Sequence, residues 1–167
     1  MEFKRGSVLT LNGNPGQLNS VIHYLSAAFC RLKEKVLFID TINSLNLHSS
    51  YFEGINQHYY FKNIYCVRTP LPYDLLARLN SSGRFIKKKK MSVLLINSLS
   101  LFFKDSPKRD VEPVMKNILN KIKELTEENQ LITILANSQL DNEQVIIASN
   151  FLSVTNKLLE VFINGTH

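Results

Sequence analysis

A chain of 167 residues with 44% hydrophobic and 20% charged residues is long enough to bury the core of one compact domain, so we expect a single domain. The net charge of +6 favours a polyanionic partner. The N-terminal apolar run is too short for a signal peptide, and the apolar runs are too short to insert into a membrane. Neither cysteine has CxxC spacing, so we expect buried free thiols and an intracellular protein, cytoplasmic or nuclear.

Apolar runs alternate with helical patterns along the whole chain, and this alternation predicts an α/β fold with a mostly parallel central sheet flanked by helices. The predicted strands cover 7–11, 35–40, 63–67, 91–97, 131–137 and 158–164. Between them, apolar residues at three- and four-residue spacing predict helices. These helices cover about 19–33, 71–85 and 111–129, with Pro113 in the first turn of the last one.

Ligands of open α/β sheets bind at the carboxyl ends of the strands, in the loops that lead to the helices. The predicted loops at this edge are 13–20, 41–50, 68–73, 98–110 and 137–143. Any functional site is therefore expected in these five segments.

The first of these loops, within LNGNPGQLNS, has the frame of a phosphate-binding loop. In the Walker A pattern, G-x-x-x-x-G-K-[ST], backbone N–H groups hold the phosphates and the Lys neutralises their charge. Gly13 and Ser20 match that spacing, but Leu18 replaces the second Gly and Asn19 replaces the Lys. The degenerate nucleotide site consists of Gly13, Pro15, Gly16 and Ser20, and we expect it not to function.

Four segments, in order and in strand context, resemble the core of the RecA/RadA recombinase family. They are GSVLTLNGNPGQLNS, KVLFIDT, MSVLLINSLSLFF and LITILANSQ. The resemblance implies a RecA-like P-loop fold over nearly the whole chain, with the third segment as the Walker B strand and Asn137 and Gln139 in place of the N-Q motif of the family. Because only MEFKR precedes Gly6, we expect a single core domain over 1–167, without the upstream DNA-binding domain and the F-x-x-A polymerisation linker of recombinases.

The departures from the family pattern remove charge. Asn97 replaces the Walker B Asp that would position Mg²⁺, Ile42 replaces a Glu that resembles a water-activating base, and Asn19 replaces the Lys. Phosphoryl transfer depends on such electrostatic stabilisation. We therefore expect a pseudo-ATPase with no catalytic residues, no cofactor and no metal. An atypical nucleotide-dependent ATPase and a RecA/KaiC-like regulatory scaffold without a DNA role are the alternatives.

Two basic segments are candidate DNA-binding sites. The first, in the loop after the Walker B strand, contains Lys104, Lys108 and Arg109. The resemblance places filament DNA at this mobile loop, although a solvated polar loop explains it equally well. The second contains Lys87, Lys88, Lys89 and Lys90. It precedes the Walker B strand and should lie on the opposite edge of the sheet, where we favour a solvated turn over a nucleic-acid or acidic-partner patch.

Aromatic residues concentrate between positions 51 and 65, and we favour a partner interface over core packing for the exposed ones. They are Tyr51, Phe52, Tyr59, Tyr60, Phe61 and Tyr65. A chain that keeps the RecA-like fold without its catalysis retains that fold for contacts. We therefore expect a non-catalytic recombinase paralogue that acts in homologous recombination and DNA repair. It would bind the recombinase, another paralogue or, independently of sequence, DNA, within an oligomer or a hetero-complex and with no membrane partner.

Overall fold

The computed structural model describes residues 3–46, 50–54, 56, 62–138, 142–144 and 146–148, and the backbone of 160–162. Its strands form one sheet in the order β3-β2-β4-β5-β1-β6, and every pair is parallel. The strands are β1 (Ser7–Gly13), β2 (Val36–Asp40), β3 (Ile64–Arg68), β4 (Val93–Asn97), β5 (Ile132–Ser138) and β6 (Glu160–Phe162). The predicted α/β class is confirmed, and the sheet is consistent with a RecA-like core.

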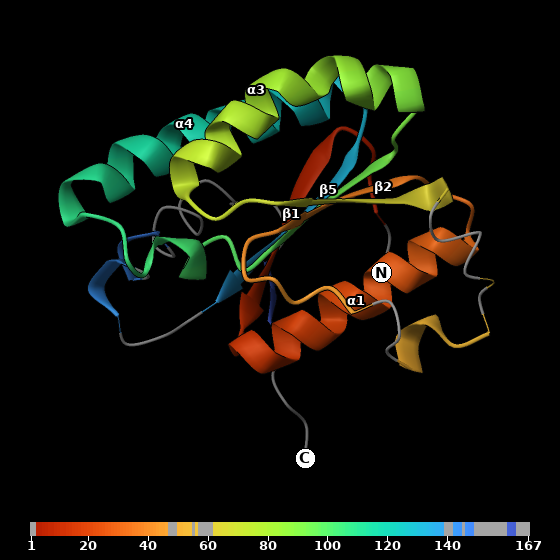
Figure 1. Cartoon of the computed structure of the whole chain (residues 1–167), viewed down its shortest axis with the longest axis horizontal. Coiled ribbons are helices and arrows are strands. Elements are labelled where there is room, and N and C mark those ends of the chain that lie inside the picture. Colours follow the sequence, from red (N-terminus) through yellow and green to blue (C-terminus); the bar gives the residue numbers. More distant parts are fainter. Residues whose placement is uncertain are drawn as a thin grey trace.

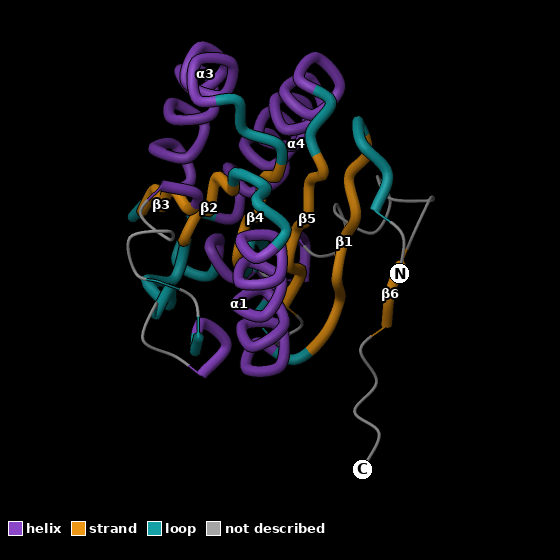
Figure 2. The backbone as a smooth tube through the Cα atoms, turned by 90° about the vertical axis from the view of Figure 1, so that its right-hand side faces the viewer, coloured by secondary structure: helices purple, strands orange, loops and turns teal. Residues whose placement is uncertain are grey.

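Helices cover both faces of this sheet (Figures 1 and 2). α1 (Pro15–Arg31) and the short 3-10 helix η1 (Ser50–Phe52) lie on one face. α3 (Pro72–Lys89) and α4 (Lys108–Asn129) lie on the other, and the 3-10 helix η2 (Leu101–Phe103) follows β4. Crossovers between parallel strands are right-handed. The chain runs across the sheet from β1 through β2 to β3 and returns through β4 to β5, so its outward and return connections lie on opposite faces.

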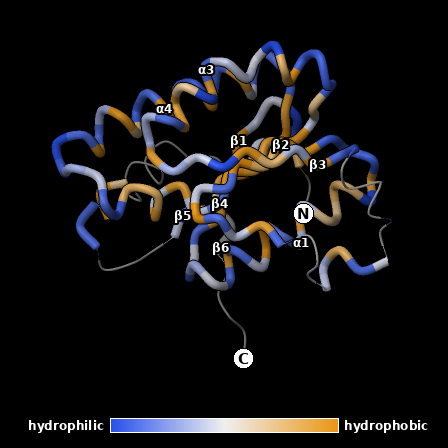
Figure 3. Tube along the Cα trace, viewed as in Figure 1, coloured by the Kyte–Doolittle hydropathy of each residue, from blue (hydrophilic) through white to orange (hydrophobic). Residues whose placement is uncertain are grey.

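Alternate strand residues supply two apolar clusters, one under each helical layer. In β2 and β4 every residue is buried, which explains why these strands are continuous apolar runs (Figure 3). The cluster under α3 and α4 includes Leu37, Ile39, Leu94 and Ile96. The cluster under α1 includes Val36, Phe38, Val93 and Leu95. Each such side chain contributes about 1.5–3 kcal/mol by leaving water, so these clusters hold the strand ends in fixed register.

The helix boundaries differ from the prediction at three points. α1 begins at Pro15 rather than near Asn19. α3 continues to Lys89, so the expected solvated turn at 87–89 is the last turn of a helix. α4 begins at Lys108, which places Pro113 in its second turn instead of its first. None of the helices that the structure describes has the length and apolar character to cross a membrane.

The described aromatic residues of the 51–65 segment pack within the protein. Phe52 is buried under α1, and Tyr51 contacts Tyr24 edge-on with ring centroids 6.5 Å apart. Tyr65 contacts Phe85 in the same way at 5.5 Å. Phe52 is therefore a core residue, Tyr51 and Tyr65 are partly buried against neighbouring rings, and Tyr59, Tyr60 and Phe61 lie outside the described residues, so the partner interface stays a prediction.

Candidate functional site

Polar residues occupy the carboxyl ends of four neighbouring strands. Asn12 in β1, Asn137 in β5, Asn97 in β4 and Asp40 in β2 are all buried. Asp40 and Asn97 are paired in register, and their strands form the switch point of the sheet, because β2 continues on the α1 face and β4 continues on the α4 face. Open α/β sheets bind ligands at such a point. The candidate site therefore centres on Asp40 and Asn97.

The glycine-rich segment in front of this point does not form a phosphate-binding loop. A single residue, Asn14, separates β1 from α1, and its Oδ1 accepts a hydrogen bond from the Gly16 N–H at 2.9 Å. The Leu18 N–H bonds to the Asn14 carbonyl at 2.9 Å, so two N–H groups that would face a phosphate are used within the helix start. Neither Gly13 nor Gly16 has a positive φ, although the N–H nest of a phosphate loop requires such a conformation.

An asparagine N-cap followed by proline at the first helical position explains this early helix start. The Asn14-Pro15 pair is therefore the sequence signal for a helix that begins at Pro15. Leu18 is completely buried under the sheet, whereas Ser20 is exposed and donates to the Gly16 carbonyl at 3.2 Å. The hydroxyl that should bind Mg²⁺ thus bonds to its own helix.

Two amide side chains, those of Asn19 on α1 and Asn97 at the end of β4, contact each other. Asn97 Nδ2 donates to Asn19 Oδ1 at 3.0 Å and to Ser44 Oγ at 2.6 Å. Both amide protons of Asn97 are therefore satisfied at a position with no exposed area. Here a neutral amide pair joins α1 directly to β4.

Asp40 on β2 is the register partner of Asn97 on β4. Its two carboxylate oxygens accept hydrogen bonds from the turn that follows β2. Oδ1 accepts from the Ser44 N–H at 2.9 Å, and Oδ2 accepts from the Leu45 N–H at 2.9 Å. The neighbouring Thr41 hydroxyl donates to the Asn97 carbonyl. These bonds give Asp40 a structural role in positioning Ser44, which is in turn a partner of Asn97.

His23 and Ser44 belong to the same network, and neither was a predicted site residue. The His23 ring lies between α1 and the turn after β2, with Nδ1 at 2.6 Å from the Asn19 carbonyl and Nε2 at 3.0 Å from the Ser44 carbonyl. The Asn46 N–H also points to Nε2 at 3.2 Å. The four-residue spacing of Asn19 and His23 on one helix was the only sequence signal for this contact.

A second amide pair joins the first and fifth strands. Asn137 Nδ2 donates to Asn12 Oδ1, and the two residues are partners in the β1–β5 register. Asn137 Oδ1 is buried without a hydrogen-bond partner. Asn137 therefore bonds across the strand ends, while Gln139 lies outside the described residues.

The three cations predicted to bind DNA after β4 each lie beside a carboxylate. Lys104 pairs with Asp105 at 3.9 Å, and Arg109 pairs with Asp110 at 3.7 Å. Lys108 forms an ion pair with Glu143. Phe102 and Phe103 of η2, in front of these residues, are buried, while Lys108 and Arg109 begin α4. DNA binding by these residues stays a prediction.

The second basic segment lies on the opposite edge of the sheet, as predicted. Lys87, Lys88 and Lys89 form the last turn of α3, and Lys90 is its C-cap. The structure thus separates the two DNA-binding candidates instead of bringing them together. The Walker-like residues and the lysine run also lie at opposite ends of the strands.

The hydrogen bonds at the carboxyl edge hold α1 and the turn after β2 against the sheet. Its network consists of amides, hydroxyls, one imidazole and the Asp40 carboxyl, with no cation among the side chains that it joins. Within the described residues, no three His, Cys, Asp or Glu side chains lie close enough together to hold a metal ion. Neither a scan against models of known protein families nor a search of curated proteins finds a match to this chain.

Proposed function

We propose that the chain is a non-catalytic RecA/RadA-like paralogue that acts as an accessory protein in homologous recombination and DNA repair. The observation that carries this proposal is the Asn97–Asn19 hydrogen bond of 3.0 Å, which occupies the positions of the Walker B Asp and the Walker A Lys. The resemblance supplies the family, and the amide pair supplies the reason for expecting no ATP hydrolysis. The chain would act inside the cell, in the cytoplasm or the nucleus.

The proposal is supported by the described hydrogen bonds of Asn19 and Asn97, which include no lysine or arginine that could stabilise a transferred phosphoryl group. Catalysis of phosphoryl transfer requires a cation near the phosphates and Mg²⁺ held by an acidic residue. Asn19 and Asn97 supply neither, and the N–H groups of Gly16 and Leu18 are already bonded. A protein that has this fold but does not hydrolyse ATP would act through its surfaces, by binding a recombinase, another paralogue or DNA.

Strand exchange by a purified recombinase of the RecA/RadA family, with ATP and with or without this protein, tests the proposal. We expect the protein to sediment with the recombinase filament and to change the rate of strand exchange, while it hydrolyses no ATP by itself. Light scattering of the protein alone should show no long filaments. If the protein neither associates with any recombinase filament nor alters strand exchange, the proposed function is wrong and the regulatory scaffold takes its place.

A further inference from the structure

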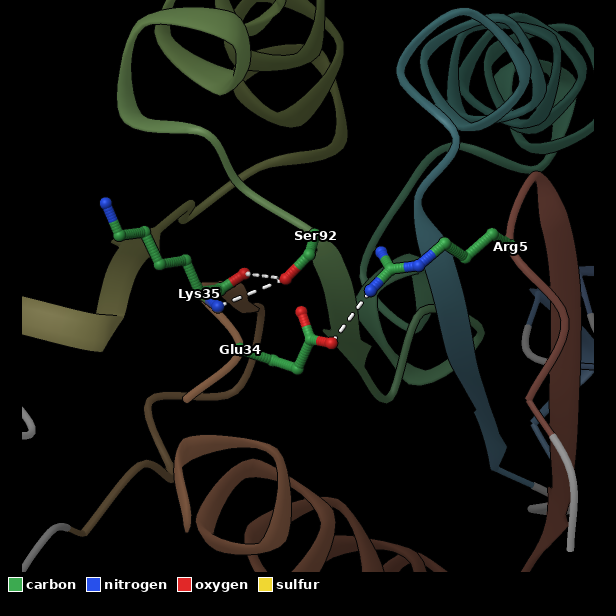
Figure 4. Close-up of polar contacts among 4 residues, drawn as sticks. All are labelled: Arg5, Glu34, Lys35 and Ser92. Carbon is green, nitrogen blue, oxygen red and sulfur yellow. Dashed lines mark hydrogen bonds and ion pairs between the residues drawn. The ribbon is translucent and has the colours of Figure 1, made fainter. Parts of the chain in front are cut away.

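Cations gather at the amino-terminal edge of the sheet, which we term the basic edge. They lie in the turns before β1, β2 and β3 and at the end of α3. The basic edge consists of Lys4, Arg5, Lys33, Lys35, Lys62, Lys87, Lys88, Lys89 and Lys90. Figure 4 shows part of it, where Arg5 pairs with Glu34 at 2.7 Å and the Lys35 backbone bonds to Ser92. Glu127 and Glu128 end α4 at the same edge, and Glu127 is paired with Lys123 at 3.9 Å.

Two of these lysines serve the fold itself. Lys35 Nζ donates to the Lys89 carbonyl at 2.9 Å and so caps the carboxyl end of α3. Lys89 Nζ lies 5.6 Å from the centre of the Tyr65 ring, in a cation–π contact. The exposed lysines Lys33, Lys62, Lys87, Lys88 and Lys90 differ, because no carboxylate in the described part of the chain forms an ion pair with them. Their charge is free to act on a partner.

Two of these lysines also have an unusual backbone conformation. Lys33 and Lys90 have φ values of 63° and 54°, in the left-handed region where glycine is the favoured residue at a helix end. A lysine side chain is unfavourable there because its Cβ crowds the following carbonyl. Two of the turns that lead into the sheet therefore carry a lysine against the preference of the backbone.

We propose that the basic edge binds the phosphate backbone of a nucleic acid without reading its sequence. Neighbouring strands lie roughly 4.8 Å apart, so the turns before β3, β2 and β4 present Lys62, Lys33 and Lys90 as a row of cations along the edge. A row of this kind can neutralise successive phosphates and release their counterions. The contact lies at the end of the sheet opposite to the degenerate nucleotide loop.

A nucleic acid fits this row better than a lipid surface does. Proteins that lie on membranes insert a broad apolar face beside their cations. Of the large hydrophobic residues that are exposed in the described chain, Leu32 alone adjoins the basic edge. The choice of nucleic acid among polyanions also rests on the proposed function.

The double variant Lys33→Gly/Lys90→Gly tests the inference without damaging the fold, because glycine suits both backbone conformations. Binding to a fluorescent thymidine oligonucleotide is measured by anisotropy across a salt series. Each lost phosphate contact should reduce the salt slope by about 0.7, so the double variant should lose about 1.4 in slope and bind about 25-fold more weakly near 0.1 M salt. Its resistance to urea should equal or exceed that of the wild-type protein.

Matched controls separate charge from backbone. Gln130 has a φ of 52° in the corresponding turn before β5, so Gln130→Gly makes the same backbone change without removing charge and should leave the affinity unchanged. The inference is overturned if Lys108→Ala/Arg109→Ala reduces the slope while the double glycine variant does not. It is also overturned if wild-type protein binds vesicles containing phosphatidylserine but no oligonucleotide. Association with the recombinase is measured in a separate experiment. A failure of nucleic-acid binding at the basic edge therefore does not decide whether the proposed function is correct.

Discussion

Replacing Asn97 by Asp introduces a carboxylate at a buried site where the described bonds of the Asn97 amide nitrogen reach only Asn19 and Ser44, with no cation. Asn97 is fully buried, and its Nδ2 supplies the protons for bonds to Asn19 Oδ1 at 3.0 Å and to Ser44 Oγ at 2.6 Å. An aspartate has no such protons, so one of its oxygens would face the Asn19 oxygen. It would also stand beside Asp40, its register partner on β2, and create two buried carboxyl groups with no cation between them.

The expected cost of Asn97→Asp is about 3–5 kcal/mol of unfolding free energy near neutral pH, the range for an uncompensated buried charge. Burial and the neighbouring carboxyl would raise the pKa of the new Asp in the folded state above its usual value of about 3.9. The folded variant then holds its proton more tightly than the unfolded chain does. Its stability relative to the wild-type protein is therefore lowest near neutral pH and recovers as pH falls toward about 4, leaving about 1–2 kcal/mol for the lost hydrogen bonds.

Urea unfolding of wild-type and variant protein at about pH 7.5 and about pH 4.5 measures both parts of this penalty. Asn117→Asp is the matched control, because Asn117 is exposed on α4 and the same substitution there should change stability by less than about 0.5 kcal/mol. The reasoning is refuted if Asn97→Asp is as stable as Asn117→Asp near neutral pH, or if its deficit does not shrink on acidification.

Three further outcomes follow from the same contacts. Asn14→Ala removes the cap of α1 and should lower the unfolding free energy by about 1 kcal/mol, and an unchanged urea midpoint would contradict the capping role. Leu18→Gly restores the glycine of the Walker pattern but empties a fully buried position, so calorimetry should show a loss of at least about 2 kcal/mol and no gain of ATP binding. Cys30 is buried but Cys66 is exposed, so the prediction of two buried thiols is wrong for Cys66. Burial raises the pKa of both thiols, so access decides between them: iodoacetamide should label Cys66 first in native protein and reach Cys30 only on unfolding, and equal labelling rates measured by mass spectrometry would exclude this.

The strands could be predicted because strands that are buried on both faces have a recognisable local sequence pattern. VLFID and VLLIN are buried on both faces, and such strands appear as continuous apolar runs followed by polar residues at the carboxyl edge. The polar ends Asp40 and Asn97 could thus be assigned to one edge from sequence. The start of α1 is also encoded locally, because an asparagine N-cap followed by proline is a signal for the beginning of a helix. The glycine pattern of this segment predicts a loop as far as Ser20 instead.

The amide pair could not be predicted, because it depends on packing. Asn19 and Asn97 are 78 residues apart, and their contact requires the position of α1 across β4 as well as the rotation of the helix. Sequence spacing defines neither quantity. The resemblance to the recombinase family predicts amides where two charged groups would be, and the structure shows that these two amides bond to each other. The left-handed conformation of Lys33 was likewise invisible, since lysine carries no signal for a positive φ.

Calorimetric titration of the purified protein with ATP and Mg²⁺ tests the central claim most directly. The amide pair at Asn19 and Asn97, together with the bonded N–H groups at the start of α1, predicts no binding heat at physiological nucleotide concentrations and no release of phosphate. Micromolar ATP binding that requires Mg²⁺ and is abolished by Ser20→Ala would contradict the claim, because Ser20 now bonds only within its helix among the contacts described.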